Sequence, residues 1–431
     1  MKNRIIVLIT LLISSITLSA QERLVLTLDS AKHYALEYNR ELIKSGISIQ
    51  KAQAQLWQTI SLGLPQVNGT VDYSNYLGAE MKIQLDESMP PASIPFKATS
   101  NAVIQVTQLV FSGSYWVGIE LSKLAKQIIE TQVTRTELEV KQGVASAFFN
   151  ILMAQEAKDI IMKNLKNLQD MYSKTEAMYK AGVAEETDVD QFSVQVMNLE
   201  TTLKSTDRNI ELAYNLLRLQ LGVGGQTEIQ IIGNLDEMAK ALNIDQMLGT
   251  TMDLSGNVNY LLMQQQIDIM KKQVELQKWS YAPTVAGFYN FTHKILKPSF
   301  DASPKHVIGL QANIPIFSSG DRKNKVTEAK LNLKSAEVDI ENVADQLTIQ
   351  EKQLRFNLQS AYDQYLTQRK NVITSRKVFN SMKVKYEQGV ISSLDLTTAN
   401  SNYLQAENTY ISAMLSLLQA QTDLEKLLGT L

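Results

Sequence analysis

The chain has no cysteine and only three histidines in 431 residues. The lack of cysteine excludes disulfide bonds, thiolate metal sites, a cysteine nucleophile and a lipid anchor carried on cysteine. The histidines, His33, His293 and His306, are scattered and leave little material for acid–base chemistry. Because no nucleophile, base and orienting group cluster together either, we expect neither an enzyme nor a bound cofactor.

An excess of charge of one sign is also missing, since 42 Lys and Arg stand against 44 Asp and Glu. This balance argues against a disordered polyelectrolyte and against a nucleic-acid binder with a basic footprint. Hydrophobic residues make up 44% of the chain, which is enough for an ordered protein.

Long apolar runs are absent except at the start of the chain. Residues 1–20 combine two basic residues, Lys2 and Arg4, with an apolar core over 5–18 and small residues before Gln21. That core would be about 21 Å long as a helix, short of the roughly 30 Å of a bilayer interior. We therefore predict a cleaved export signal. Its removal leaves a net charge near −4 (40 − 44).

Proline is confined to two windows, which leaves residues 96–282 and 316–431 without any. Proline breaks helix interiors, so these stretches permit very long helices. Residues 114–180 and 321–387 are rich in helix formers, and each would extend about 100 Å as a helix. Within the second, apolar residues spaced three and four apart predict a coiled-coil seam: Leu333, Ala336, Ile340, Val343, Leu347, Leu354 and Ala361.

The proline-containing windows show a period of two instead. Apolar residues alternate with others over 100–111 and 306–317, and more weakly over 65–76 and 283–293. This pattern predicts β-strands with one apolar face, paired as two hairpins.

The chain also repeats itself at an offset of 207 residues. Residues 21–222 and 257–431 each predict a helix, a hairpin (65–111 or 283–317), a long helix and a return helix. Eight positions are identical when 207 is added: Gly113, Tyr179, Gly182, Val183, Asp188, Glu200, Leu221 and Gly222. The opening prolines differ by 218, so the first hairpin is 11 residues longer (218 − 207) and should carry an elaborated loop. The glycine-rich residues 223–256 are a predicted connector with a small strand and helix.

Four strands with an apolar face suit a bilayer only as part of a closed barrel, and four cannot close alone. Several copies of the chain would therefore have to share one barrel. Trp57 and Trp279 precede rising strands and Trp116 follows a descending one, which places all three at the same rim. Tryptophan is enriched at such membrane–water boundaries.

Several motifs resemble the TolC family of outer-membrane efflux proteins, over essentially the whole mature chain. The opening helix is similar in Leu26, Thr27, Leu28, Ala31, Ala35, Leu36, Asn39 and Leu42. Trp279, Ala282 and Pro283 resemble the family's helix-to-strand junction. Its strand-to-helix turn resembles residues 315–322, with a first-repeat copy at 110–113.

This resemblance implies an α+β membrane channel. In it, a homotrimer forms one twelve-stranded transmembrane β-barrel in outer-membrane lipid. An α-helical coiled-coil barrel continues through the periplasm, with a mixed equatorial belt that includes residues 223–256. The family exports substrates delivered by an inner-membrane pump (RND, ABC or similar) and a periplasmic adaptor.

The resemblance also assigns a gate at the periplasmic helix tips. Asp395 matches one member of the family's aspartate ring, while Tyr386 and Asp188 match the tyrosine and aspartate that link neighbouring hairpins. Two positions depart, because Thr398 replaces the second ring aspartate and Ile391 replaces the linking arginine. We therefore expect fewer ion pairs in the closed state, unless a lysine at 383 or 385 substitutes.

The same acids have a simpler interpretation as helix caps. Ser392 with Asp395 fits a capping box, and Thr187 with Asp188 could cap the other return helix.

The turns at these tips resemble the family's contacts with the adaptor. The residues concerned are Gly182, Val183, Gly389, Val390 and Ser392. The alternative is that the glycines simply end their helices.

Other interpretations compete with a channel. His293 and His306 bracket one hairpin loop and could bind a metal, although two solvated histidines are the more ordinary case, and we expect no metal site. The heptads alone would also suit an exported coiled-coil adhesin or a periplasmic adaptor without a barrel. The two alternating hairpins favour the channel.

Overall fold

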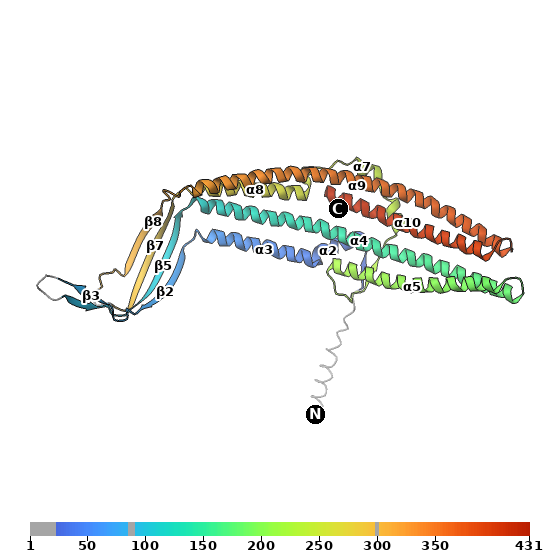
Figure 1. The fold of residues 1–431 in the computed structure, drawn as a ribbon, viewed down its shortest axis with the longest axis horizontal. Helices are drawn as coiled ribbons and strands as arrows, with labels where there is room; N and C mark the ends of the chain where they lie inside the picture. Colours follow the sequence, from blue (N-terminus) through green and yellow to red (C-terminus); the bar gives the residue numbers. More distant parts are fainter. Residues whose placement is uncertain (1–22, 85–90, 298–300) are drawn as a thin grey trace, which may run out of the picture. The chain divides into compact units, whose positions relative to one another are not determined.

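The computed structural model describes residues 23–84, 91–297 and 301–431 (Figure 1). The predicted export signal, residues 1–20, lies outside the described residues. The chain forms two compact units. The first contains the described residues before Ile47 together with Val133–Tyr260 and Ala344–Leu431, and the second contains Ile47–Gln132 and Leu261–Val343.

The second unit contains a four-stranded antiparallel sheet in the order β2-β5-β7-β8 (Figure 1). Its strands are β2 (Gln66–Ser74), β5 (Thr99–Phe111), β7 (Thr284–Leu296) and β8 (His306–Asn313). The two predicted hairpins therefore join through the pairing of β5 with β7. The last strand was expected to reach Phe317 but ends at Asn313. Pro315 lacks the N–H that a sheet ladder requires, so the strand stops before it.

The extra length of the first hairpin forms a small hairpin of its own. Strand β3 (Glu80–Ile83) pairs antiparallel with β4 (Ala92–Pro95). The predicted elaboration of this loop is thus confirmed.

The register gives the four-stranded sheet two different faces. One row across the first face comprises Val67, Val106, Tyr289 and Ile308. The adjacent row, on the opposite face, comprises Asn68, Gln105, Asn290 and Val307. The apolar face is not covered, since Ile308 is 84% exposed and Leu310 is 75% exposed. Among the described residues, neither β2 nor β8 has a second strand beside it.

The helical part of this unit comes from α3 (Arg40–Ser61), α4 (Gly113–Lys180), α8 (Val258–Trp279) and α9 (Asp321–Glu387). Glycine permits close packing where these helices meet the strands. A Cβ on Gly63 would lie 2.3 Å from the Tyr115 ring, and one on Gly113 would lie 2.0 Å from the Trp279 ring. The Tyr115 hydroxyl also donates to the Ile60 carbonyl oxygen at 2.9 Å.

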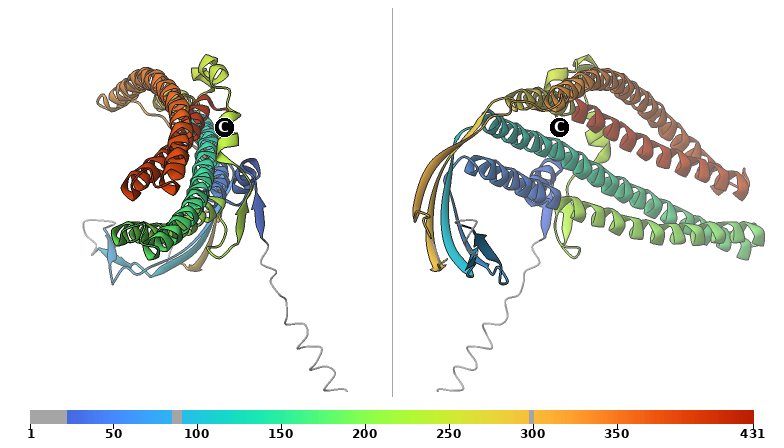
Figure 2. Two further views of the ribbon diagram at one scale, coloured as in Figure 1. Left: turned by 90° about the vertical axis from the view of Figure 1, so that its right-hand side faces the viewer. Right: turned by 60° about the vertical axis from the view of Figure 1, so that its left-hand side comes forward.

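The first unit is built from long helices that run in two hairpins. In the first hairpin α4 returns as α5 (Glu186–Leu221), and in the second α9 returns as α10 (Ser393–Leu428). Adding 207 to the bounds of α5 gives those of α10 (186 + 207 = 393; 221 + 207 = 428). Away from the turns the helices lie in the order α5, α4, α10, α9, as both views show (Figures 1 and 2).

Apolar side chains hold this unit together in two clusters. The larger one includes Val144, Phe148, Ile151, Leu217, Leu221, Leu358, Leu417 and Leu424. The smaller one lies nearer the turns and comprises Leu168, Met171, Phe192, Phe379, Tyr386 and Leu396. None of the described helices is long and apolar enough to cross a membrane.

The connector contributes a small layer on the long helices of the first unit. Strand β6 (Ile229–Ile231) pairs parallel with β1 (Leu24–Leu26), next to α2 (Leu28–Tyr38). It continues as α6 (Leu235–Lys240), α7 (Ile244–Gly249) and η1 (Leu254–Gly256). The Tyr410 hydroxyl of α10 donates to Asp236 Oδ1 of α6 at 2.6 Å.

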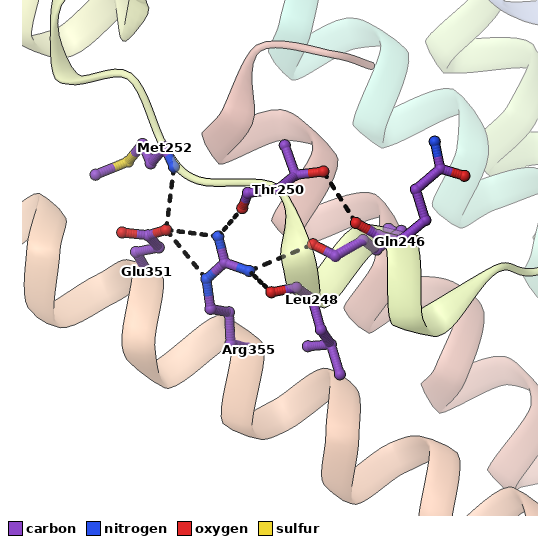
Figure 3. A network of polar contacts seen from close by, with 7 residues as sticks. Gln246, Leu248, Thr250, Met252, Glu351 and Arg355 are labelled. Carbon is purple, nitrogen blue, oxygen red and sulfur yellow. Dashed lines mark hydrogen bonds and ion pairs between the residues drawn. The ribbon is translucent and has the colours of Figure 1, made fainter.

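Arg355 links α7 to α9 through hydrogen bonds (Figure 3). Arg355 Nη1 donates to the Leu248 carbonyl oxygen at 2.7 Å, and Nη2 donates to the Thr250 carbonyl oxygen. Arg355 is held by Glu351, whose Oε1 lies 2.6 Å from Nη2 and also accepts the Met252 N–H at 3.3 Å. The guanidinium therefore satisfies carbonyl groups at the end of α7 that the helix leaves unpaired.

Candidate functional site at the helix tips

The two helical hairpins turn in the same way. Gly182 and Gly389 have φ values of +73° and +71°, in the left-handed region that glycine adopts without strain. The N–H of Gly182 donates to the Tyr179 carbonyl oxygen, and the N–H of Gly389 donates to the Tyr386 carbonyl oxygen, both at 2.9 Å. The N–H of the following valine donates to the carbonyl oxygen five residues earlier in both turns, which completes a Schellman motif.

These turns present an open surface. Val183 is 72% exposed and Val390 is 67% exposed. No atom lies within 4 Å of a Cβ built on Gly182 or Gly389. Both glycines therefore end their helices, and the space around them is free for a partner.

The predicted capping box at the start of α10 is confirmed. The Ser392 hydroxyl accepts the Asp395 N–H at 3.2 Å, and Asp395 Oδ2 accepts the Ser392 N–H at 3.2 Å. The expected cap by Thr187 is wrong, because α5 begins at Glu186 and Glu185 is its N-cap. Asp188 Oδ2 accepts the Glu185 N–H at 3.4 Å.

Side-chain contacts join the two hairpins near their tips. The Tyr386 hydroxyl lies 2.8 Å from the hydroxyl of the fully buried Thr175. Lys174 Nζ lies 2.7 Å from Glu387 Oε1. The Ser393 hydroxyl donates to Asp188 Oδ1.

Within one chain the Tyr386 hydroxyl bonds to Thr175, while the Ser393 hydroxyl donates to Asp188. Lys174 supplies the cation that pairs with Glu387 between these two hairpins. The links between neighbouring hairpins through Tyr386, Asp188 and a lysine at 383 or 385 stay predictions. A single sequence does not reveal which faces of α4 and α9 meet, so neither Thr175 nor Lys174 could be singled out.

The contacts shift the acidities of the groups involved. The hydrogen bond from Lys174 lowers the pKa of Glu387, and the same bond raises the pKa of Lys174. Burial raises the pKa of Tyr386 more than the Thr175 hydroxyl lowers it. At neutral pH the tips therefore carry an ion pair and a neutral tyrosine.

The two positions that depart from the family pattern have local roles. Ile391 packs against the smaller apolar cluster. The Thr398 hydroxyl donates to the Leu394 carbonyl oxygen at 2.8 Å, within its own helix.

The predicted rim tryptophans belong to the second unit and lie on the helical side of its junctions. Trp57, Trp116 and Trp279 are 60%, 63% and 41% exposed. Trp116 lies in the first turn of α4, and Trp279 is the last residue of α8. Their placement at a membrane boundary stays a prediction.

The two histidines of the second hairpin lie on one face of the sheet without a common ligand set. His306 Nδ1 lies 2.8 Å from the Tyr289 hydroxyl, and His293 is opposite Ala102. Across the described ranges, no group of three or more potential metal ligands comes together.

Comparison with known proteins gives this architecture a family. The chain matches the family described as outer membrane efflux protein over residues 32–223 and 257–430. It belongs to this family. Outer membrane protein TolC of Escherichia coli K12 is 21% identical over 416 residues, covering 91% of this chain and 80% of the relative. The cation efflux system protein CusC of Escherichia coli O157:H7 is also 21% identical, covering 88% of this chain and 80% of CusC.

A solved structure shares the fold. The CmeC outer membrane channel of Campylobacter jejuni superposes with a TM-score of 0.76 at 17% identity, covering 94% of this chain and 85% of CmeC.

Membership confirms the expected α+β channel fold, its internal duplication and its site in the cell. An outer membrane efflux protein is the outer-membrane channel of a tripartite efflux system and extends into the periplasm. Members of the family are channels rather than enzymes. The adhesin and adaptor alternatives are therefore set aside.

Proposed function

We propose that three copies of this chain assemble into one export duct across the outer membrane. The observation that carries this proposal is the four-stranded sheet with one apolar face and two open edges. Three such sheets supply twelve strands, enough for a closed barrel whose apolar face meets lipid. Trp57, Trp116 and Trp279 would mark its periplasmic rim. In this proposal the chain consists of an export signal over 1–20, two structural repeats over 21–222 and 257–431, and a connector of the equatorial belt over 223–256.

The helix tips form the proposed gate and docking surface. Three copies of Asp395 would surround the axis and control passage, together with Asp188 and Tyr386. The exposed turns would contact a periplasmic adaptor through Gly182, Val183, Gly389, Val390 and Ser392. This docking role is supported by the Schellman geometry that both turns share, which gives a trimer six similar contact points (3 × 2).

Membrane fractionation followed by light scattering in detergent tests the proposal. We expect the protein in the outer-membrane fraction, with a protein mass three times that of the mature chain. A soluble periplasmic monomer would overturn it, because four strands cannot bury their apolar face alone.

A further inference from the structure

A cavity lies between the two helical hairpins of the first unit, near their tips. Its volume is about 390 Å³, which is within the usual range for sites that hold small molecules. Met171, Ala177 and Met178 line it from α4, and Leu396 lines it from α10. Met171 and Leu396 are buried, whereas Ala177 is exposed to solvent. The body of the cavity is therefore apolar and can be reached from outside.

Three charged side chains also line this cavity: Lys174, Lys383 and Glu387. Lys174 pairs with Glu387 at 2.7 Å. The pKa of Glu387 is lowered by the hydrogen bond from Lys174 and, to a smaller extent, by the charge of Lys383. In the part of the chain that the structure describes, Lys383 itself forms no ion pair. The lining therefore has one positive charge in excess (2 − 1), at the edge of an apolar space.

We propose that this cavity binds a small amphipathic anion. An aromatic or aliphatic body fills the space between Met171, Met178 and Leu396, and a sulfonate or carboxylate group pairs with Lys383. Removal of apolar surface from water supplies affinity. The charge-assisted bond to Lys383 favours an anion over a neutral molecule of the same shape, and the same charge repels a cation.

A bound anion also ties the two hairpins together. The lining comes from α4 of one hairpin and from α9 and α10 of the other. Across the same seam Tyr386 already bonds to Thr175, and Glu387 to Lys174. A ligand that contacts both hairpins favours the arrangement in which they meet, so it should lower the resting conductance of the channel. This effect rests on the proposed function, whereas binding needs only one chain.

The absence of cysteine allows the cavity to carry a single reactive thiol. In Ala177→Cys, 2-naphthalenesulfonate at about ten times its Kd, measured by calorimetry, should slow maleimide labelling of the purified protein about 10-fold. Ser381→Cys is the matched control, because this exposed residue of α9 is outside the lining and its labelling should not change. The uncharged 2-naphthalenemethanol has the same rings and should protect Ala177→Cys much less.

The lysine that holds the anion can be identified in the same assay. Lys383→Gln should raise the Kd for the sulfonate about 10-fold, since it removes a charge-assisted bond. Lys385→Gln removes an exposed lysine of the same helix that is outside the lining, and should leave the Kd unchanged. Absence of protection, equal protection by the alcohol, or an unchanged Kd in Lys383→Gln would overturn the anion site.

Planar bilayers test the effect on the channel. Addition of 2-naphthalenesulfonate should lower the resting conductance of the wild type, and the same concentration should have little effect on Lys383→Gln. Protection of Ala177→Cys without a fall in conductance would overturn the link to the hairpins and leave the binding site standing. A wild-type protein that binds the sulfonate but remains a monomer would overturn the proposed function and leave the site standing.

Discussion

Asp395 caps α10, and we propose a second task for the same carboxylate at the gate. Its Oδ2 accepts hydrogen bonds from the Ser392 N–H at 3.2 Å and from the Ser392 hydroxyl at 2.8 Å. A negative charge also suits the N-terminus of α10, where the helix dipole is positive. In a trimer, three such charges near one axis would attract cations and repel anions.

The variant Asp395→Asn separates the two tasks. Asparagine keeps an acceptor oxygen for the cap but removes the charge, so we expect lower cation selectivity and weaker block by multivalent cations in planar bilayers. Ser392→Ala is the matched control, since it weakens the cap and retains the charge. If Asp395→Asn leaves selectivity and block unchanged, the acid is only a helix cap.

The hydroxyl of Tyr386 ties α9 to α4 through Thr175. Tyr386→Phe removes this bond, which is worth about 1 kcal/mol, and should modestly raise the resting conductance of the closed channel. The control is Tyr179→Phe, the repeat-equivalent tyrosine, which is 43% exposed and should change nothing. Equal conductance in both variants and the wild type would argue against a closing role for this bond.

At the scale of elements, the glycine of each tip turn faces open space, since no neighbouring atom lies within 4 Å of a Cβ built on Gly182 or Gly389. Gly389→Trp should abolish export of a fluorescent substrate while trimer yield stays normal, because the bulky ring occupies the surface offered to the adaptor. Gly389→Asn is the control, since asparagine also tolerates a left-handed φ but is small. Loss of trimer in both variants would mean that the glycine serves the turn alone.

We expect Arg355, which links α7 to α9, to stabilise this end of the connector. Arg355→Met removes charge-assisted bonds worth about 1.5–3 kcal/mol. Amide hydrogen exchange over residues 244–252 should accelerate about 10- to 100-fold, with little change in α9. Lys352→Met, an exposed cation on the same helix, provides the comparison. Unaltered exchange after Arg355→Met would show that other contacts hold α7.

Local patterns in the sequence were enough to predict most elements. Proline placement and helix-forming composition locate α4 and α9, and alternation locates the four strands of the sheet. The pairing of β5 with β7 joins two distant strands, and the bond between Lys174 and Glu387 depends on how two helix faces meet. Neither property is encoded in a local period. The end of β8 could have been predicted, since Pro315 is visible in the sequence.

For the whole molecule, the two faces of the sheet should respond differently to charge. Leu310→Arg puts a cation on the apolar face at a cost of about 2–4 kcal/mol per chain if the site is near mid-bilayer. Little assembled trimer should then appear in the outer-membrane fraction.

The adjacent variant Gln311→Arg points the same charge to the opposite face and should assemble normally. Equal yields of the two variants, measured by gel mobility before and after heating, would contradict a lipid-facing sheet.

The pairing of β5 with β7 also determines when the sheet can be completed during synthesis of the chain. Thr107 and Phe288 are opposite each other although 181 residues separate them (288 − 107). The β2–β5 hairpin is synthesised before β7, and closing so long a loop is slow. Until β7 pairs with β5, this hairpin has an apolar face and hydrogen-bonding edges without partners. We therefore expect the hairpin to depend on a chaperone until the second hairpin arrives.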